Sequence, residues 1–193
     1  RLIRRQRQMC IRDSFSPTGQ LWGNPIYDWD KHKAENYAWW VFRIQESFKL
    51  FDCLRIDHFK GFSDFWEIPA GDETAENGKW VPGPGYDLFK VVKEELGDLK
   101  IIAEDLGNID DKTRKLLADC GYPGMKILHF GFYDTTGNSI YVPHAYTQHS
   151  VAYTGTHDNE VTNGWYNNLT QEQRDYTDAY INRRQGEPIT RAL

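Results

Sequence analysis

Residues 100–104, Lys100-Ile101-Ile102-Ala103-Glu104, form a short apolar run that ends in a carboxylate. Short runs of this kind, separated by stretches with helical periodicity, are typical of parallel β-strands. The same reading predicts strands over residues 53–56, 100–103, 125–128 and 150–153, and helices over residues 30–51, 85–96 and 110–120. From Ile102 to Ile127 and from Ile127 to Ala152 the step is 25 residues each time. The sequence therefore predicts an α/β fold of successive βα units around a parallel sheet.

Composition excludes several classes of protein. The chain has 193 residues, 39% hydrophobic and 26% charged, with a formal net charge of −5, which is typical of a globular protein. No stretch approaches the roughly 18 apolar residues that a membrane-spanning helix needs, and no secretory signal opens the chain. The three cysteines form no CxxC pair, so neither a disulfide framework nor a zinc knuckle is indicated. We expect a cytoplasmic protein with reduced thiols and no membrane partner.

The two ends of the chain differ from the rest. Residues 1–14 carry five arginines against one acid, Asp13, but lack the aromatic interleaving and basic continuation of a nucleic-acid-binding arm. We therefore expect a foreign or disordered segment here and no nucleic-acid partner. At the other end the chain stops at Leu193 inside a helical-looking run, which we interpret as a truncation.

Three carboxylates end three of the predicted strands. They are Asp57, Glu104 and Asp158, with histidines beside two of them (His58 and His157). Each acid taken alone could merely cap a helix or pair with an arginine. In a (β/α)8 barrel, however, the carboxyl ends of the strands form the face that carries the active site. The combination therefore favours a catalytic interpretation.

Glycoside chemistry needs such a set of acids. One carboxylic acid must protonate the leaving oxygen, while a second carboxylate meets the oxocarbenium-like centre from the opposite face. By strand alternation Arg55 points the same way as Asp57 and would keep that aspartate ionised. Glu104 suits the acid, provided that burial or a nearby Asp57 raises its pKa.

The aromatic content supports a sugar site. Several aromatic residues fall in loop-like stretches: Trp22, Trp80, Tyr86, Tyr141 and Trp165. Trp39 and Trp40 are instead expected to pack inside a helix. Residues 69–86 and 133–148 form long polar stretches, and loops of that length are usually functional. His157, Asp158 and Glu160 lack the spacing of known zinc motifs, and no phosphate-binding glycine loop occurs, so we predict no metal and no cofactor.

The sequence closely resembles the 4-alpha-glucanotransferases, or amylomaltases, of glycoside hydrolase family 77. The matching strings are Phe15-Ser-Pro-Thr-Gly-Gln-Leu-Trp-Gly-Asn-Pro25, Leu54-Arg-Ile-Asp-His-Phe-Lys-Gly61, Ile101-Ile-Ala-Glu-Asp-Leu-Gly107 and Tyr153-Thr-Gly-Thr-His-Asp-Asn159. The second and third occur in weaker form across the alpha-amylase clan. The first, together with Trp80-Val-Pro-Gly-Pro-Gly85, is more specific to amylomaltases.

This resemblance implies a retaining transfer between alpha-1,4-glucans, with glucose or a glucan as acceptor. It makes Asp57 the nucleophile, Glu104 the general acid/base and Asp158 the stabiliser of the transition state. The substrate-binding residues that it implies are Arg55, His58, His157, Gln20, Trp22, Asn24 and Trp80. An alpha-amylase-type hydrolase is the alternative enzyme, and an inactive fragment is the alternative outside catalysis.

The resemblance also implies a partial (β/α)8 barrel. Amylomaltases are considerably longer, so residues 15–193 are expected to form a fragment of the catalytic barrel, from about strand 3 or 4 to strand 7. A complete barrel typically needs about 250 residues. Because an incomplete barrel leaves open sheet edges, we expect these 193 residues alone to be inactive and prone to aggregation.

Overall fold

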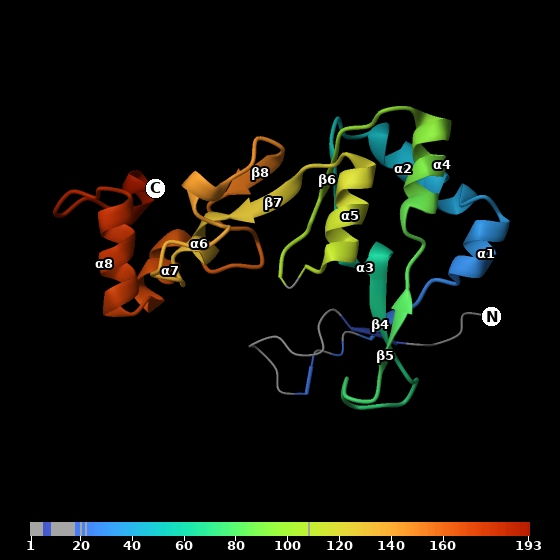
Figure 1. Ribbon diagram of the computed structural model, residues 1–193, viewed down its shortest axis with the longest axis horizontal. Coiled ribbons are helices and arrows are strands. Elements are labelled where there is room, and N and C mark those ends of the chain that lie inside the picture. Colours follow the sequence, from blue (N-terminus) through green and yellow to red (C-terminus); the bar gives the residue numbers. More distant parts are fainter. Residues whose placement is uncertain (1–5, 9–17, 20, 22, 108) are drawn as a thin grey trace. The chain divides into compact units, whose positions relative to one another are not determined.

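The computed structural model describes residues 6–8, 18, 19, 21, 23–107 and 109–193 (Figure 1). The chain divides into two compact units, Arg1–Pro123 and Gly124–Leu193, and each is described by itself. None of the helices in these described ranges is long and apolar enough to cross a membrane.

The first unit combines an antiparallel sheet with a parallel strand pair. Its strands are β1 (Gln6–Gln8), β2 (Asn24–Pro25), β3 (Leu54–Ile56), β4 (Asp64–Ile68), β5 (Lys79–Pro82) and β6 (Ile101–Ala103). Its helices are α1 (Trp29–Ala34), α2 (Ala38–Phe48), α3 (Lys60–Ser63), α4 (Tyr86–Leu96) and α5 (Asp111–Cys120). The antiparallel sheet has the order β2-β1-β4-β5, while β3 pairs in parallel with β6.

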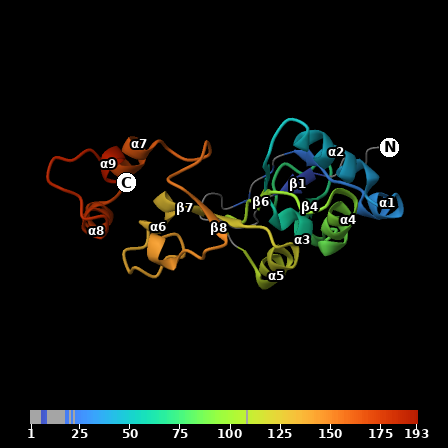
Figure 2. The same cartoon turned by 90° about the horizontal axis from the view of Figure 1, so that it is seen from above.

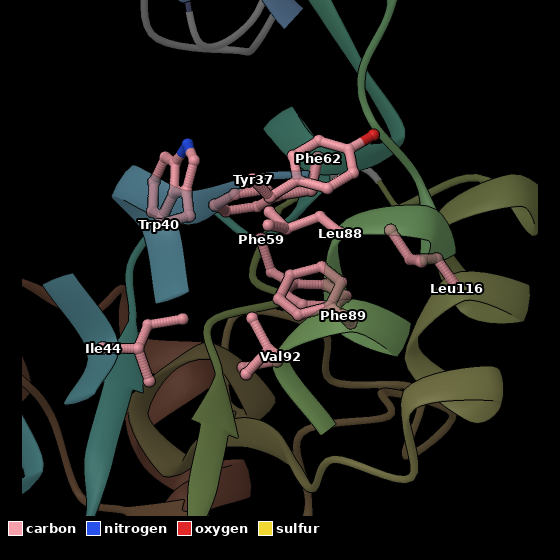
Figure 3. Packing of buried hydrophobic residues seen from close by; sticks show 10 residues of the cluster. Tyr37, Trp40, Ile44, Phe59, Phe62, Leu88, Phe89, Val92 and Leu116 are labelled. Atoms are coloured by element: carbon pink, nitrogen blue, oxygen red, sulfur yellow. The ribbon is translucent and has the colours of Figure 1, made fainter. Parts of the chain in front are cut away.

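An aromatic core holds the helices of the first unit together (Figure 3). Phe59, Leu88 and Phe89 are almost completely buried, and Figure 3 shows them between side chains of α2 and α5. The Phe59 and Phe89 ring centres are 5.3 Å apart. Burying side chains of this size contributes about 1.5–3 kcal/mol each. Phe59 follows directly on Asp57 and His58, so this core also anchors the segment that carries the first predicted site.

The helix predicted over residues 30–51 is wrong in its extent. It is divided into α1 and α2, because Asn36 and Tyr37 both adopt positive φ angles, of 49° and 53°. Asp28, rather than Asp30, caps α1 by accepting a hydrogen bond from the Lys31 amide. Trp40 and Ile44 are buried as predicted from α2, whereas Trp39 is 45% exposed.

The second unit contains one parallel strand pair and several short helices. Its strands are β7 (Gly124–Ile127) and β8 (Ser150–Tyr153), and its helices are α6 (Leu128–Gly131), η1 (Pro143–Ala145), α7 (Thr162–Asn168), α8 (Gln171–Tyr180) and α9 (Ile189–Ala192). Figure 2 shows α7, α8 and α9 gathered at one end of this unit. Phe132, Trp165, Leu169 and Ile189 form its buried core.

The sequence predicted the parallel strands and two of the helices closely. All four predicted strands are present within one residue at each end, and α4 and α5 begin one residue later than predicted. The prediction of α/β class is confirmed. The parallel strands form two separate pairs, so a continuous barrel sheet stays a prediction. The long stretch over residues 69–86 is not entirely loop, because it contains β5, which pairs with β4.

Candidate active site

Asp57 and Glu104 follow two neighbouring strands. The register of β3 and β6 pairs Ile56 with Ala103, which brings the next residues, Asp57 and Glu104, to the same end of the strand pair. The Arg55 guanidinium lies 2.9 Å from an Asp57 carboxylate oxygen. This ion pair confirms the prediction that Arg55 and Asp57 point the same way. The Asp57 side chain is 69% exposed and is therefore accessible to a ligand.

Glu104 is buried, and hydrogen bonds fix both its carboxyl group and its backbone. One carboxylate oxygen accepts the His58 amide at 2.7 Å, and the other accepts the Leu106 amide at 2.8 Å. The Glu104 amide donates to the Ile56 carbonyl, and the Glu104 carbonyl accepts the Phe59 amide, both at 2.9 Å. His58 makes its contact from a left-handed conformation, with φ 47°. The carboxyl group is thus held against the segment that carries Asp57.

Burial raises the pKa of Glu104 above its ordinary value. The hydrogen bonds from Leu106 and His58 favour the ionised form and oppose this shift, as does Arg55, while Asp57 adds to it. The net effect of removal from water and of a neighbouring negative charge is to favour the protonated acid. This direction agrees with the sequence-based expectation for a general acid.

The sequence analysis missed Lys60, which lies in the same motif as Asp57. Its ammonium contacts carboxylate oxygens of Asp64 and Asp110, each at 2.8 Å, and lies 4.8 Å from the ring centre of Trp80. Burial would lower the pKa of Lys60, but the hydrogen bonds to Asp110 and Asp64 raise it above its ordinary value. The signal that was available is a charged residue between Phe59 and Phe62, where an amphipathic pattern predicts burial.

Asp110 joins Lys60 to helix α5. One oxygen accepts from Lys60, and the other caps the helix by accepting the Thr113 amide and hydroxyl, each at 2.8 Å. Partial burial works against ionisation of Asp110, but these hydrogen bonds prevail and lower its pKa to about 2. Asp110 is therefore a negative charge at neutral pH, and Lys60 has two anionic partners.

Asp158 and His157 lie in the second unit, in the loop after β8. Their side chains are 66% and 78% exposed, and the His157 Nε2 is 3.3 Å from an Asp158 oxygen. Asn159 closes this loop because its side-chain oxygen accepts the Thr156 amide at 2.9 Å and the Thr156 hydroxyl at 3.0 Å. The predicted acids are therefore found as two groups, with Asp57 and Glu104 in one unit and Asp158 in the other.

A buried histidine supports the Asp158 loop. The His129 ring stacks on Trp165, with ring centres 4.2 Å apart and planes 7° apart, and its amide donates to the Thr154 carbonyl at 3.1 Å. Its Nδ1 has no hydrogen-bond partner among the described residues, and a Cβ atom added at Gly155 would come within 2.9 Å of it. Burial lowers the pKa of His129 and favours the neutral ring.

The other predicted binding residues have different outcomes. Trp80 is 45% exposed on β5, and Asn24 is exposed in β2. Gln20 and Trp22 lie outside the described residues. Trp165 was predicted to lie in a loop. This prediction is wrong, because Trp165 is buried in α7. No group of three or more histidine, cysteine, aspartate or glutamate side chains within the described ranges is arranged to hold a metal ion.

Comparison with known proteins connects these residues to a family. A sequence model of the 4-alpha-glucanotransferases, glycoside hydrolase family 77, matches residues 7–193. The chain belongs to this family. The 4-alpha-glucanotransferase of Streptococcus pneumoniae is 53% identical over 185 residues, or 95% of this chain, and that of Thermus thermophilus is 44% identical over 171 residues, or 88% of this chain.

A solved structure gives the same result for the fold. The amylomaltase of Streptococcus agalactiae in complex with acarbose matches 93% of this chain with 60% identity and a TM-score of 0.91. The resemblance that rested on four short strings is thus confirmed for this glucanotransferase family. The chain spans 36% of the length of both the Streptococcus pneumoniae and the Streptococcus agalactiae proteins, and 34% of the Thermus thermophilus protein.

Proposed function

We propose that this chain contributes catalytic residues to a 4-alpha-glucanotransferase, which moves a segment of an alpha-1,4-glucan to the 4-hydroxyl of another glucan or of glucose. The observation that carries the proposal is the pair of unlike carboxyl groups at the ends of β3 and β6. Asp57 is exposed and paired with Arg55, whereas Glu104 is buried and its pKa is raised. An exposed carboxylate paired with an arginine suits a nucleophile, and a buried carboxyl group with a raised pKa suits an acid.

In the first step Asp57 attacks the anomeric carbon of the donor glucan. The bond from this carbon to the glycosidic oxygen breaks, and Glu104 transfers its proton to that oxygen, which leaves as the 4-hydroxyl of the departing chain. Asp57 is then esterified to the sugar, as in retaining glycosidases. Neighbouring strands support this route, because retention requires carboxyl groups about 5–5.5 Å apart.

In the second step the ionised Glu104 removes the proton from the 4-hydroxyl of an acceptor. The acceptor oxygen attacks the anomeric carbon, the ester bond to Asp57 breaks, and both carboxyl groups return to their starting states. Asp158 would stabilise the positive charge that develops on the sugar in both steps. Transfer exceeds hydrolysis when the acceptor sugar excludes water from the intermediate.

The remaining assignments follow the family resemblance. Arg55, His58 and His157 would contact the sugar at the bond that breaks, and Gln20, Trp22, Asn24 and Trp80 would contact the rest of the glucan. Residues 15–193 would form part of a cytoplasmic (β/α)8 barrel, with residues 1–14 outside it. No cofactor takes part in the mechanism as proposed.

The decisive experiment uses a full-length enzyme. We define the host as the Streptococcus agalactiae amylomaltase in which this chain replaces the matching segment, which is 36% of that protein. Incubation of the host with maltotriose is expected to yield glucose together with a ladder of longer maltodextrins. The products are separated by chromatography, and host carrying Asp57→Ala is the inactive control.

Two outcomes would contradict the proposal. Shortened oligosaccharides without longer products would instead indicate the alpha-amylase-type hydrolase. A folded host that binds maltodextrin but converts none of it would indicate that this chain does not supply a working catalytic segment.

A further inference from the structure

We propose that Lys60 is a positioning residue that holds the Asp57 segment and the Glu104 segment in one catalytic geometry, acting through Asp110. This inference rests on the proposed function. It concerns a residue that takes no part in the bond-making steps above.

The contacts that join the two segments include the following three, in addition to the hydrogen bond from the Glu104 amide to the Ile56 carbonyl. The Phe59 amide donates to the Glu104 carbonyl at 2.9 Å, and the His58 amide donates to the Glu104 carboxylate at 2.7 Å. The third contact is the 2.8 Å ion pair between Lys60 and Asp110. This third contact joins two side chains, so mutagenesis can adjust it without altering Glu104 itself.

The backbone conformation at His58 has to be stabilised by surrounding contacts. His58 has φ 47°, a left-handed conformation that is unfavourable for a residue with a side chain. Conformations of this kind persist where the surrounding structure holds them, and they concentrate at active sites. Phe59 stabilises this turn by packing in the aromatic core, and Lys60 stabilises it through the ion pair with Asp110.

The two anionic partners of Lys60 are expected to have different roles. Asp64 is four residues away in the chain, so its contact with Lys60 stabilises the local passage from α3 into β4. Asp110 is fifty residues away and begins the helix that follows the Glu104 segment. Of the two ion pairs of Lys60, the one with Asp110 therefore connects the two segments that carry the proposed catalytic acids.

The pair Asp110→Asn and Asp64→Asn tests this division. Asparagine is a good helix cap, so Asp110→Asn removes the charge that faces Lys60 while keeping a capping side chain for α5. In the host with maltotriose we expect Asp110→Asn to lower kcat about 10- to 100-fold, because small misplacements of reacting groups cost up to about that much. We expect KM to change less than about twofold. Asp64→Asn is the matched control and should lower the melting temperature while keeping kcat per folded molecule within about twofold.

Lys60 itself supplies the second arm of the test. Lys60→Met should reproduce the loss of kcat seen in Asp110→Asn. Combining the two changes should add little further loss, because each removes the same ion pair between Lys60 and Asp110. Lys60→Arg should restore part of the activity because it keeps the positive charge. The charges that act on Glu104 are those of Asp57 and Arg55, so the alkaline limb of the pH–rate profile should stay in place in all variants.

Several results would overturn the inference. Normal kcat per folded molecule in Asp110→Asn would do so, as would equal losses of kcat in Asp110→Asn and Asp64→Asn, which indicate a purely structural cluster. A displaced alkaline limb would indicate an electrostatic role in place of positioning. A loss confined to KM and to the Lys60 variants would point to the Trp80 contact. Because unmodified host is assayed in parallel, failure of the proposed function is separately visible.

Discussion

The two units place a carboxylate at the end of a parallel strand in opposite surroundings. Glu104 is buried, and both of its oxygens accept backbone amides. Asp158 is largely exposed, and its loop is held by hydrogen bonds within the loop and by a buried histidine beneath it. In the first unit the acid itself is buried, whereas in the second a buried histidine, His129, supports the loop that carries an exposed acid.

This difference corresponds to the two tasks proposed for the acids. A general acid must keep its proton near neutral pH, and removal from water achieves that. A carboxylate that stabilises a positive transition state must stay ionised, which exposure to water allows. The second acid then depends on its loop for orientation, so the two units should respond differently to the same kinds of change.

The largest expected effect is on the acid of the first unit. Glu104→Gln in the host should lower kcat for maltotriose about 10²- to 10⁴-fold, the usual contribution of general acid–base catalysis. With maltosyl fluoride as donor, the first step should survive, because fluoride leaves without being protonated. Rapid-quench measurement of a fluoride burst checks this. Asp158→Asn is the comparison, since it should slow the first step with both donors.

Equal losses with both donors in Glu104→Gln would show that the buried carboxyl group is not the acid. The pH dependence provides a further check. Activity that needs protonated Glu104 falls as pH rises through its pKa, which burial has raised. The alkaline limb should therefore lie above the ordinary glutamate pKa of about 4.3.

The next largest effect is expected at His129, which supports the loop that carries Asp158. His129→Ala removes a buried ring that stacks on Trp165 and lies against Gly155, while it leaves the backbone hydrogen bond to Thr154 in place. Truncation of a buried ring of this size should lower the unfolding free energy by about 3 kcal/mol. Thermal unfolding of the host, with hydrogen exchange over residues 150–160, measures the change.

Gln148→Ala provides the control, because Gln148 is an exposed residue of the same unit. It should leave stability within about 0.5 kcal/mol of the unmodified host. If His129→Ala were equally mild, the Asp158 loop would not depend on the buried histidine, and the contrast between the two units would be lost.

A smaller effect is expected within the Asp158 loop. Asn159→Ala removes the acceptor of both the Thr156 amide and the Thr156 hydroxyl. The loss should be about 1–2 kcal/mol in local stability, the usual cost of leaving such groups unpaired. Faster exchange of the Thr156 amide measures it, and Asn163→Ala, an exposed asparagine in α7, is the control. Unchanged exchange would mean that the loop is held by other contacts.

The ends of β3 and β6, which carry Asp57 and Glu104, were predicted well for a physical reason. Runs such as Ile101-Ile102-Ala103 are short and apolar, with Ile101 and Ala103 buried, so their composition marks them as strands, and the acid that follows each run marks its carboxyl end. The Arg55–Asp57 pair followed from strand alternation alone. These features depend on residues that are close in the chain.

Features that depend on distant residues were not predictable in the same way. Lys60 binds Asp110, and His129 stacks on Trp165, across 50 and 36 residues of chain. The local pattern around Lys60 indicates burial, but nothing in it identifies Asp110 as the partner. The break between α1 and α2 was missed because helical periodicity continues through Asn36 and Tyr37, although both adopt left-handed conformations that few residues other than glycine favour.

The smallest expected effect is a pH dependence of stability that belongs to His129. Burial lowers its pKa in the folded protein, so the unfolded chain binds a proton more readily. The stability contributed by the neutral ring is therefore complete above the unfolded histidine pKa of about 6.5 and is lost as pH falls below it, down to the lowered folded value. Unfolding of the host between pH 7.5 and about 5 should show this loss, and His129→Phe should reduce it while Gln148→Ala leaves it unchanged. An identical acid dependence in His129→Phe would assign the sensitivity to other groups. The two units would then differ in the burial of their acids, Glu104 and Asp158, but His129 would not make the stability of the second unit depend on pH.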